Sequence, residues 1–557
     1  MDTETTGFNC VGGEDRCIGV SIAALLDGEP VAHYYGIDHT IGENVDPSTL
    51  AQLKYVLEQE GRPLIFANVQ FDVLALETID IHTADNPFWD ILTVANMVDE
   101  NNPIQKSLAQ LSLRYLGEQG KIDTPQITKE KKSGWLNTTP EQMYEYAVAD
   151  AVTTWRIWDQ LTHHEEWTAI PEEVWEQKQR LIRVLMHMRR RGIMIDQPLA
   201  TSMVEIGDAR IEEIKAELGV NPASNKDMYE LLIEQLKLPV LKVSKKTGKP
   251  SFDKFAMEEY EELLERMDSP VAKLIREFRG WQKAISASYK PYLELVDSDG
   301  RLRCSYKTHG TVSGRLSCAE PNLQQIPKAS DKPWNGKVKD CFIAKPGYTL
   351  VEFDYSQLEL RLGTAYANEE SLKTVFAEGR DIFDEMSAQL GMTRQDTKTL
   401  VYSMQYGAGE KRIMAAFGVD QPEAKRLREN YFNTYPRFKA LSDAAADRAA
   451  QLGRVKIWSG RYRHFQYPSE SYKALNSIIQ GGAADIVERI MVRAFDQIDN
   501  EDCRLLLQVH DSLMWEIKTD KVPEYMEKIQ TLMEDVEPKD FDVRFAVEAK
   551  ILGGNNE

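Results

Sequence analysis

The stretch of residues 348–366 reads YTLVEFDYSQLELRLGTAY and combines a strand pattern, an acidic residue and a helix pattern. Its first part, Tyr348–Phe353, is rich in β-branched and aromatic residues and predicts a strand that leads directly into Asp354. Ser356–Tyr366 then reads as a helix. An acidic residue at the carboxyl end of a strand, ahead of a helix, is well placed to hold a metal ion in an open cleft.

A second acidic residue lies between two apolar runs in residues 505–515, LLLQVHDSLMW. The polar turn His510-Asp511-Ser512 is typical of a hairpin that presents Asp511. Either aspartate alone would more often be an ordinary turn residue. Together, Asp354 and Asp511 offer the paired ligands that two-metal phosphoryl transfer needs, with metals about 3.5–4 Å apart.

Between these acids, residues 393–407, TRQDTKTLVYSMQYG, predict a helix that begins at the N-cap Thr393. Arg394, Lys398, Tyr402 and Tyr406 recur at every fourth residue and therefore share one face. Two cations followed by two aromatic rings suit a nucleotide, with its phosphates at one end and its sugar and base at the other. A surface helix with a partly buried aromatic pair explains the same pattern, and the residues alone leave both interpretations open.

The first residues, MDTETTG, contain another acidic pair. Asp2 and Glu4 point to the same face if this segment is a strand, and two such carboxylates repel unless solvent or a cation lies between them. Asp72 follows shortly after another strand-like run, and Tyr146 and Asp150 lie one helical turn apart. An exposed strand would be the simpler explanation of Asp2 and Glu4 alone, whereas the full set favours a metal site.

The composition is that of a globular protein of several domains, because 557 residues are too many for one hydrophobic core. The net charge of -21 argues weakly against nucleic-acid binding, but binding depends on the local field, and basic residues can gather in one cleft. The basic runs 189–191 and 242–249, each taken alone, are better explained as a solvated helix end and a solvated loop. No apolar run is long enough to span a membrane and no signal peptide is readable, which predicts a cytoplasmic protein without a membrane partner.

Residues 1–165 alternate strand-like and helix-like segments, which predicts an α/β domain. The expected strands are Ile18–Leu26, Val31–Tyr35 and Leu64–Ala67, and the expected helices are Ser48–Gln59 and Glu141–Leu161. The following segments are mainly helical: Trp175–Arg191, Met257–Met267 and Val271–Leu295. Lys242–Ser251 lacks apolar periodicity and predicts a loop.

The set Asp2, Glu4, Asp72, Tyr146 and Asp150 resembles the DEDD exonucleases, in the variety with a tyrosine in the third motif. The resemblance implies a ribonuclease H-like 3′–5′ exonuclease whose four carboxylates hold two divalent cations. One metal would activate a water, and the other would stabilise the departing 3′ oxygen. Tyr146 would orient the water.

The later motifs are similar to those of the polymerase I family (family A), in the same order. DYSQLELR at residues 354–361 is very close to the family's motif A, residues 394–407 match motif B, and QVHD at residues 508–511 matches motif C. Further matches are SGRLS at 313–317, PNLQQIP at 321–327, Asn476 with QGGAAD at 480–485, and the thumb-like residues 221–251. The resemblance covers nearly the whole chain and implies a template-directed DNA polymerase with an attached proofreading exonuclease.

The implied fold class is multidomain, α/β and α+β, with a ribonuclease H-like exonuclease domain followed by a right-hand polymerase. Its expected parts are the exonuclease domain (1–165), the thumb (166–300), the first part of the palm with motif A (301–363), the fingers with motif B (364–475) and the second part of the palm with motif C (476–557). The implied partners are primer–template DNA and deoxynucleoside triphosphates, bound by a monomer.

The family's site residues carry over onto matching positions. Asp354 and Asp511 would hold two Mg²⁺ ions, for which Mn²⁺ is expected to substitute. Arg394 and Lys398 would bind the triphosphate, and Lys398 would protonate the departing pyrophosphate. Glu359 and Tyr402 would crowd the sugar 2′ position and exclude ribonucleotides. The remaining implied contacts are those of Gln357, Tyr406 and His510 with the nucleotide, and those of Arg315, Asn476, Gln480 and Asn68 with the DNA.

The chain departs from the family pattern in a few places. Ser512 stands where a glutamate usually follows the motif C aspartate, which removes a nearby charge but no principal metal ligand, so activity is expected to survive. Tyr402 stands where family members often have phenylalanine, and its hydroxyl is expected to substitute for a missing sugar 3′-OH, so that dideoxynucleotides are accepted. Because only Met1 precedes Asp2, we expect no 5′-nuclease domain, and the compact length suggests a phage-type enzyme.

Two other functions stay open. One is an exonuclease whose polymerase half only holds DNA, and the other is a non-enzymatic DNA-binding scaffold with decayed sites. Loss of Asp354 or Asp511 would favour the first, and both are present. Intact acids in both halves argue against the second.

Overall fold

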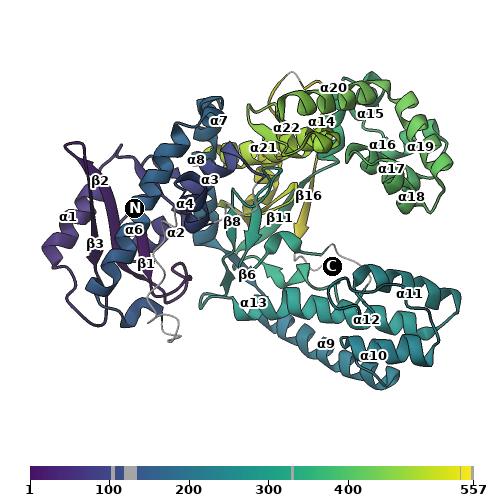
Figure 1. Ribbon diagram of the computed structural model, residues 1–557, viewed down its shortest axis with the longest axis horizontal. Helices are drawn as coiled ribbons and strands as arrows, with labels where there is room; N and C mark the ends of the chain where they lie inside the picture. Colours follow the sequence, from purple (N-terminus) through teal and green to yellow (C-terminus); the bar gives the residue numbers. More distant parts are fainter. Residues whose placement is uncertain (102–106, 118–133, 328–331, 540, 553–557) are drawn as a thin grey trace. The chain divides into compact units, whose positions relative to one another are not determined.

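The computed structural model describes residues 1–557 apart from 102–106, 118–133, 328–331, 540 and 553–557 (Figure 1). The chain divides into two compact units. The first comprises Met1–Arg191, Ser305–Ala319 and Val351–Lys550, and the second comprises Gly192–Cys304, Glu320–Leu350 and the residues from 551 onward. The expected five-part division is finer than this and stays a prediction. No helix in the described part of the chain is long and apolar enough to cross a membrane.

The first unit begins with a three-stranded antiparallel sheet, as the alternating pattern predicts. Its order is β1 (Asp2–Thr5), β2 (Cys17–Leu26) and β3 (Glu29–Gly36), and β4 (Leu64–Phe66) pairs in parallel with β5 (Phe88–Asp90). The helices of this part include α1 (Pro47–Leu57), α2 (Val69–Glu77), α3 (Ile91–Val98) and α6 (Pro140–Thr162). Helix α6 begins at a capping box and lies against β2 and β3, while α2 lies against β1.

Helix α8 (Glu172–Arg191) also packs within the first unit. Trp175 stacks on Trp89 with ring centroids 5.0 Å apart, and Ile182 and Met186 join the core under the N-terminal sheet. The opposite side of α8 contacts α21 (Ala474–Gln497). The long amphipathic run therefore buries apolar residues on more than one side.

A four-stranded sheet forms the centre of the later part of the chain. Its order is β14 (Cys503–Val509), β15 (Ser512–Lys518), β11 (Tyr348–Tyr355) and β16 (Val547–Leu552), and the predicted hairpin is the β14–β15 pair. Helices α14 (Leu358–Ala367), α21 and α22 (Val522–Glu534) belong to the same part. Residues 512–517 of β15 are all buried, so both faces of the sheet are covered at this central strand.

A helical region follows α14 and has its own apolar core, which includes Leu400, Tyr431 and Phe438. Its helices are α15 (Glu370–Ala377), α16 (Ile382–Leu390), α17 (Arg394–Gln405), α18 (Glu410–Phe417), α19 (Gln421–Thr434) and α20 (Pro436–Leu452). Helix α17 starts where predicted, since Thr393 Oγ1 accepts from the Asp396 backbone at 3.1 Å.

The second unit is mainly helical. Its longer helices are α9 (Gln197–Leu218), α11 (Lys254–Arg266) and α12 (Pro270–Ala284). The predicted helix Val271–Leu295 is instead three segments, because Ile285–Tyr289 has π-helical hydrogen bonding before α13 (Lys290–Glu294) begins. Lys242–Ser251 contains no named helix or strand, as expected, and only a bridge between Val243 and Pro250.

Buried polar contacts join the N-terminal part to the four-stranded sheet inside the first unit. Gln70 Nε2 donates to the Tyr306 carbonyl at 3.0 Å. The Tyr306 hydroxyl donates to the Gln508 carbonyl at 2.7 Å and accepts from the Gln508 backbone at 2.9 Å. Thr93 and Thr308 hydroxyls lie 2.7 Å apart. Residues 305–319 therefore bridge the two parts.

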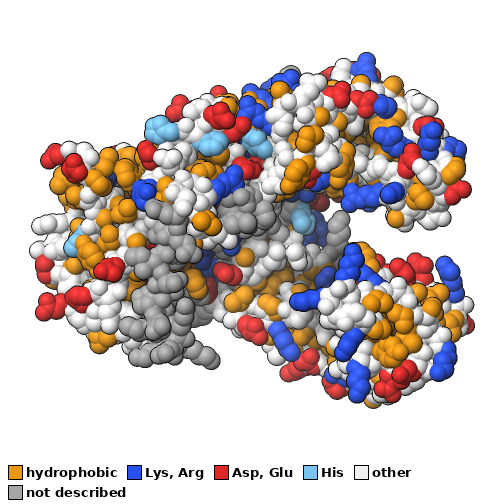
Figure 2. Space-filling view, viewed as in Figure 1, with side chains coloured by type: hydrophobic (Ala, Val, Ile, Leu, Met, Phe, Trp, Pro, Cys, Tyr) orange, Lys and Arg blue, Asp and Glu red, His pale blue; other side chains and the backbone are white. Residues whose placement is uncertain are grey.

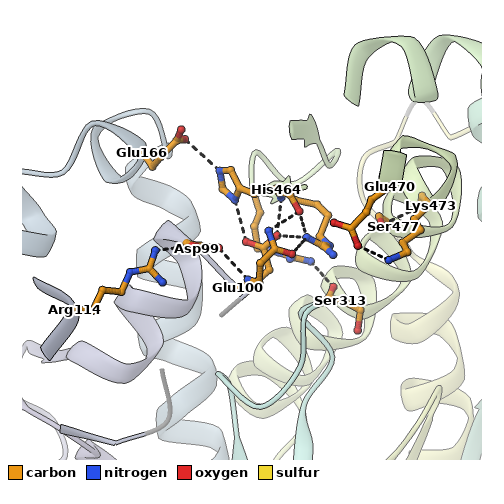
Figure 3. Close-up of polar contacts among 12 residues, drawn as sticks. Asp99, Glu100, Arg114, Glu166, Ser313, His464, Glu470, Lys473 and Ser477 are labelled. Carbon is orange, nitrogen blue, oxygen red and sulfur yellow. Dashed lines mark hydrogen bonds and ion pairs between the residues drawn. The ribbon is translucent and has the colours of Figure 1, made fainter. Parts of the chain in front are cut away.

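Figure 3 shows another junction, centred on Glu100 and His464. Glu100 Oε1 accepts from the His464 backbone at 2.6 Å and from Arg463 Nη1 at 2.9 Å. His464 Nδ1 lies 2.9 Å from Glu100 Oε2, and Nε2 lies 3.2 Å from Glu166 Oε2. The imidazole ring thus bridges two carboxylates that come from separate segments of the chain.

The ion pair between Lys178 on α8 and Glu488 on α21 is buried, with side chains 6% and 4% exposed. Removing one partner leaves an uncompensated buried charge. Lys178→Met is therefore expected to lower the free energy of unfolding by about 3–5 kcal/mol. Urea unfolding followed by tryptophan fluorescence measures the loss.

Lys528→Met is the matched control. Lys528 pairs with Glu524 on the surface of α22, and exposed pairs contribute about 1 kcal/mol or less. Equal losses in the two variants would contradict the assignment of Lys178 as the partner of a buried charge.

Candidate active sites

Asp354 and Asp511 come from neighbouring strands of the four-stranded sheet. Asp354 is exposed near the end of β11, and Asp511 occupies the turn between β14 and β15. The backbone N–H of Tyr355 donates to the Asp511 carbonyl at 3.3 Å, which holds the two acids side by side. His510 in this turn has a φ of 56°, a left-handed value that is uncommon outside glycine. Backbone contacts thus bring the predicted pair together.

Arg315 lies between Asp511 and Glu359. Its Nη2 atom is 2.6 Å from Glu359 Oε1 and 3.4 Å from Asp511 Oδ1. Glu359, in the first turn of α14, is 9% exposed, and burial raises the pKa of its carboxyl although Arg315 opposes the rise. Tyr406 Oη lies 3.5 Å from the other carboxylate oxygen of Glu359. These predicted residues form one connected polar group.

Tyr402 and Tyr406 lie on the same side of α17 as this group. Burial raises the pKa of both phenols, and the negative charge of Glu359 raises it further. The Tyr402 ring packs against Phe383 with centroids 5.9 Å apart. Gln480 on α21 forms a hydrogen bond with Tyr406. The predicted aromatic pair is therefore next to the buried glutamate.

The two basic residues of α17, Arg394 and Lys398, contact α16 and not the Arg315–Glu359 group. Arg394 pairs with Asp381 at 2.7 Å and with Asp384 at 2.9 Å, both at the start of α16. Lys398 is exposed, with Nζ 5.9 Å from the centroid of the Phe383 ring. In this structure Arg394 is thus held against α16 and is not in the Arg315–Glu359 group.

A cavity of about 990 Å³ opens beside Tyr406, within the first unit. Gly407 in its wall has a φ of 66°, and a Cβ there would lie 2.4 Å from the Tyr472 carbonyl, so glycine is required. The basic residues that line the cavity are Lys411, Arg412, Arg428 and Lys473. Figure 2 shows blue Lys and Arg side chains gathered around α17 and α18. Local positive charge therefore exists in a chain that is acidic overall.

The predicted DNA contacts Asn476 and Gln480 lie one turn apart on α21, and Asn476 also lines this cavity. Helix α21 packs closely, since a Cβ on Gly482 would lie 2.8 Å from the Leu362 side chain on α14. Gln357 occupies the turn before α14 with a φ of 55°. These positions are set by backbone geometry and close helix packing.

The N-terminal acids lie around one tyrosine. Glu4, Asp72 and Asp150 are 5%, 3% and 4% exposed, and Tyr146 is 7% exposed. Burial raises the pKa of the Tyr146 phenol, and the charges of Asp150, Glu4 and Asp2 raise it further, which places all three acids near it. The predicted set is therefore brought together by β1, α2 and α6.

Asp72 is fixed by the strand that carries the first two acids. Its Oδ1 accepts from the Thr3 backbone at 3.1 Å and from the Thr3 hydroxyl at 2.7 Å. Burial raises the pKa of Asp72 to about 6, while the Thr3 hydrogen bonds oppose the rise. Asn68 is the exposed N-cap residue of α2, one turn before Asp72, and its side chain makes no capping hydrogen bond.

The carboxylates of the N-terminal acids are suitable ligands for divalent cations. Carboxylate oxygens are the ligands that Mg²⁺ and Mn²⁺ prefer. Burying three carboxylates is costly unless positive charge offsets it, and the Met1 ammonium group interacts with Asp72 and Asp2. Among the described residues, no three His, Cys, Asp or Glu side chains are close enough to hold one metal ion together. A cation held here would therefore take its remaining ligands from water or from the phosphates of a bound nucleic acid.

Some residues of the sites were not predicted from the sequence. Thr3, Asp381 and Asp384 were missed, because their partners are separated from them along the chain. Ser512 Oγ lies 3.3 Å from Oε1 of Glu352, another residue that was missed. Glu352 is two positions before Asp354, so the two-residue period of a strand was the available signal.

Two family models match the chain: "DNA polymerase family A" over residues 195–556 and "3'-5' exonuclease" over residues 1–165. A thermostable DNA polymerase I of Thermus filiformis is 28% identical over 502 residues, covering 84% of this chain and 59% of that protein. A DNA polymerase I of Pseudomonas aeruginosa is 27% identical over 589 residues, covering 99% of this chain and 62% of that protein. The chain thus spans about three fifths of the length of these relatives.

A solved structure, described as the "POL domain of Pol1 from M. smegmatis complex with DNA primer-template and dNTP", has the same fold. The TM-score is 0.80 at 21% sequence identity, covering 99% of this chain and 95% of that one. The expected fold class, an exonuclease domain followed by a family A polymerase domain, is confirmed. The chain belongs to DNA polymerase family A and carries a 3′–5′ exonuclease domain in residues 1–165.

Proposed function

We propose that the chain is a DNA-directed DNA polymerase that extends a primer on a template and removes nucleotides from the same 3′ end by its exonuclease, in DNA replication or repair. The observation that carries the proposal is the pairing of Asp354 with Asp511 through the Tyr355 hydrogen bond. Arg315 and Glu359 lie beside this pair as one connected group. Family membership supports the same reaction class.

Asp354 and Asp511 would hold two Mg²⁺ ions, with Mn²⁺ as an expected substitute. When bound, such ions lower the pKa of the primer 3′-hydroxyl and neutralise charge on the triphosphate. Arg315, 3.4 Å from Asp511, would turn to the primer end together with Asn476 and Gln480. Minor-groove acceptors are alike for all correct base pairs, so contacts there would test pair shape without reading sequence.

Arg394 and Lys398 would bind the triphosphate. Arg394 would exchange the carboxylates of Asp381 and Asp384 for phosphate oxygens, which suit its planar fork equally well. The exchange costs little, because both ion pairs are solvent-exposed. Lys398 would give its proton to the departing pyrophosphate.

Glu359 and Tyr402 would crowd the sugar 2′ position and exclude ribonucleotides. The ion pair with Arg315 and the contact with Tyr406 would keep the glutamate side chain in place. Tyr406 would lie near the templating base. Gln357 and His510 would contribute further nucleotide contacts.

The exonuclease would use the N-terminal acids in the same chain. Asp2, Glu4, Asp72 and Asp150 would hold two divalent cations, which supply a water nucleophile and stabilise the leaving oxygen when bound. Tyr146 would orient the attacking water, and its burial among these acids keeps the phenol protonated. Asn68 would contact the DNA strand. We also propose a monomeric state, from the resemblance, and a cytoplasmic location and a phage origin.

Asp354→Asn and Asp150→Asn are expected to separate the two activities. On a 5′-labelled primer–template with Mg²⁺, Asp354→Asn should lose extension by about 1,000-fold or more, because several kcal/mol of charge stabilisation depend on its ligand oxygen. It should still shorten the primer when nucleotides are omitted. Asp150→Asn should extend the primer normally and lose shortening.

Asp520→Asn, on the exposed segment before α22, is the control and should change neither activity. Shortening without extension in the unaltered chain would favour an exonuclease on a silent polymerase scaffold. Absence of both activities would favour a DNA-binding scaffold.

Tyr402→Phe is expected to reduce acceptance of dideoxynucleotides. If the hydroxyl replaces the missing sugar 3′-OH, its loss should lower kcat/KM for a dideoxynucleotide, relative to the deoxynucleotide, by about 10–100-fold. Single-nucleotide incorporation measures the ratio. Tyr467→Phe, at a tyrosine that is 63% exposed, is the control. An unchanged ratio in Tyr402→Phe would exclude this role for the hydroxyl.

A further inference from the structure

Position 512 differs from the family pattern, and the structure shows which acidic residue lies beside it. A glutamate usually follows the motif C aspartate, and this chain has Ser512, which is 5% exposed at the start of β15. Ser512 Oγ lies 3.0 Å from the Val509 carbonyl and 3.3 Å from Oε1 of Glu352. The neighbouring strand β11 therefore brings a carboxylate to the position that lacks one.

Glu352 shares a face of β11 with Asp354. Side chains two residues apart on a strand point the same way, and their Cα atoms are roughly 6.5 Å apart. Val351 and Phe353, which point to the other face, are both 0% exposed. Glu352 is half-buried and Asp354 is exposed. The face of β11 that carries Asp354 thus carries two carboxylates.

We propose that Glu352 supplies the third carboxylate of the polymerase centre, in place of the acid that position 512 lacks. The inference rests on the proposed function and deepens it. Glu352 acts as a positioning residue: its negative charge, added to those of Asp354 and Asp511, strengthens the attraction of that site for divalent cations. Its contact with Ser512 restrains the Glu352 side chain on the face of β11 that carries Asp354.

Glu352→Gln tests the charge while keeping the size of the side chain and an oxygen that accepts from Ser512. A unit charge at this separation, partly screened by solvent, changes the affinity for a divalent cation on the order of tenfold. The Mg²⁺ concentration that gives half-maximal primer extension should rise about tenfold. The rate at saturating Mg²⁺ should stay near that of the unaltered chain.

A sharper test exchanges the residues at positions 352 and 512, so that the carboxylate stands at position 512. Glu352→Ser should have the same raised Mg²⁺ requirement, and Glu352→Ser combined with Ser512→Glu should restore it to within about twofold. Glu527→Gln, at an exposed glutamate of α22, is the control for loss of a carboxylate elsewhere. A role in packing alone would lower the thermal midpoint and leave the Mg²⁺ requirement unchanged.

Calorimetric titration with Mn²⁺ gives a readout that does not depend on activity. The full chain carries Asp72→Asn and Asp150→Asn, which weaken the exonuclease sites. In this background Glu352→Gln should reduce the affinity for Mn²⁺ about tenfold. The control Glu527→Gln should leave that affinity unchanged. Equal affinities, or an unchanged Mg²⁺ requirement in Glu352→Gln, would overturn the inference. If the unaltered chain extends no primer, the proposed function fails, and the Mn²⁺ titration still decides whether Glu352 belongs to a cation site.

Discussion

The hydrogen bond from the Tyr355 backbone to the Asp511 carbonyl aligns the two acids of the proposed polymerase centre. It aligns the end of β11 with the β14–β15 turn, so that Asp354 and Asp511 meet at one place on the sheet. Apolar residues of the same strands are fully buried and hold the sheet in place: Phe353, Leu513 and Trp515 are 0% exposed. A buried sheet that supports the exposed Asp354 and the half-buried Asp511 is what a preorganised cation site requires.

Gathering like charges is costly, and the structure offsets the cost locally. Arg315 stands between Asp511 and Glu359 and interacts with both. On α21, Asp485 pairs with Arg461 and Glu488 pairs with Lys178, and all four side chains are buried. In the N-terminal part Thr3 satisfies Asp72 with hydrogen bonds. The acids named here, Asp511, Glu359, Asp485, Glu488 and Asp72, therefore each have a specific neighbour in a chain whose net charge is -21.

The two candidate centres belong to one compact unit, because buried polar side chains connect them. Tyr306 links α2, which carries Asp72, to β14, which leads to Asp511. A second connection runs through Glu100 and His464. Polar groups buried in this way must keep their partners, since each lost partner leaves an unsatisfied group in a low-dielectric interior. These hydrogen bonds and the packing of α8 against both the N-terminal core and α21 together place the two centres in the first unit.

Features that depend on neighbours along the chain could be predicted from the amino-acid sequence. Residue types and their spacing predicted the strand before Asp354, the hairpin around Asp511 and the helix capped by Thr393. These features depend on strand pleating, turns and caps, which act over a few residues. The amino-acid sequence also showed the identity of the acids and their family order. The pairs Arg315–Glu359, Arg394–Asp381 and Ser512–Glu352 became visible in the folded chain, as did the placement of α8 with the first unit. Such contacts join segments from 13 to 160 residues apart, and a pattern read along the chain carries no information about which distant side chains packing will bring together.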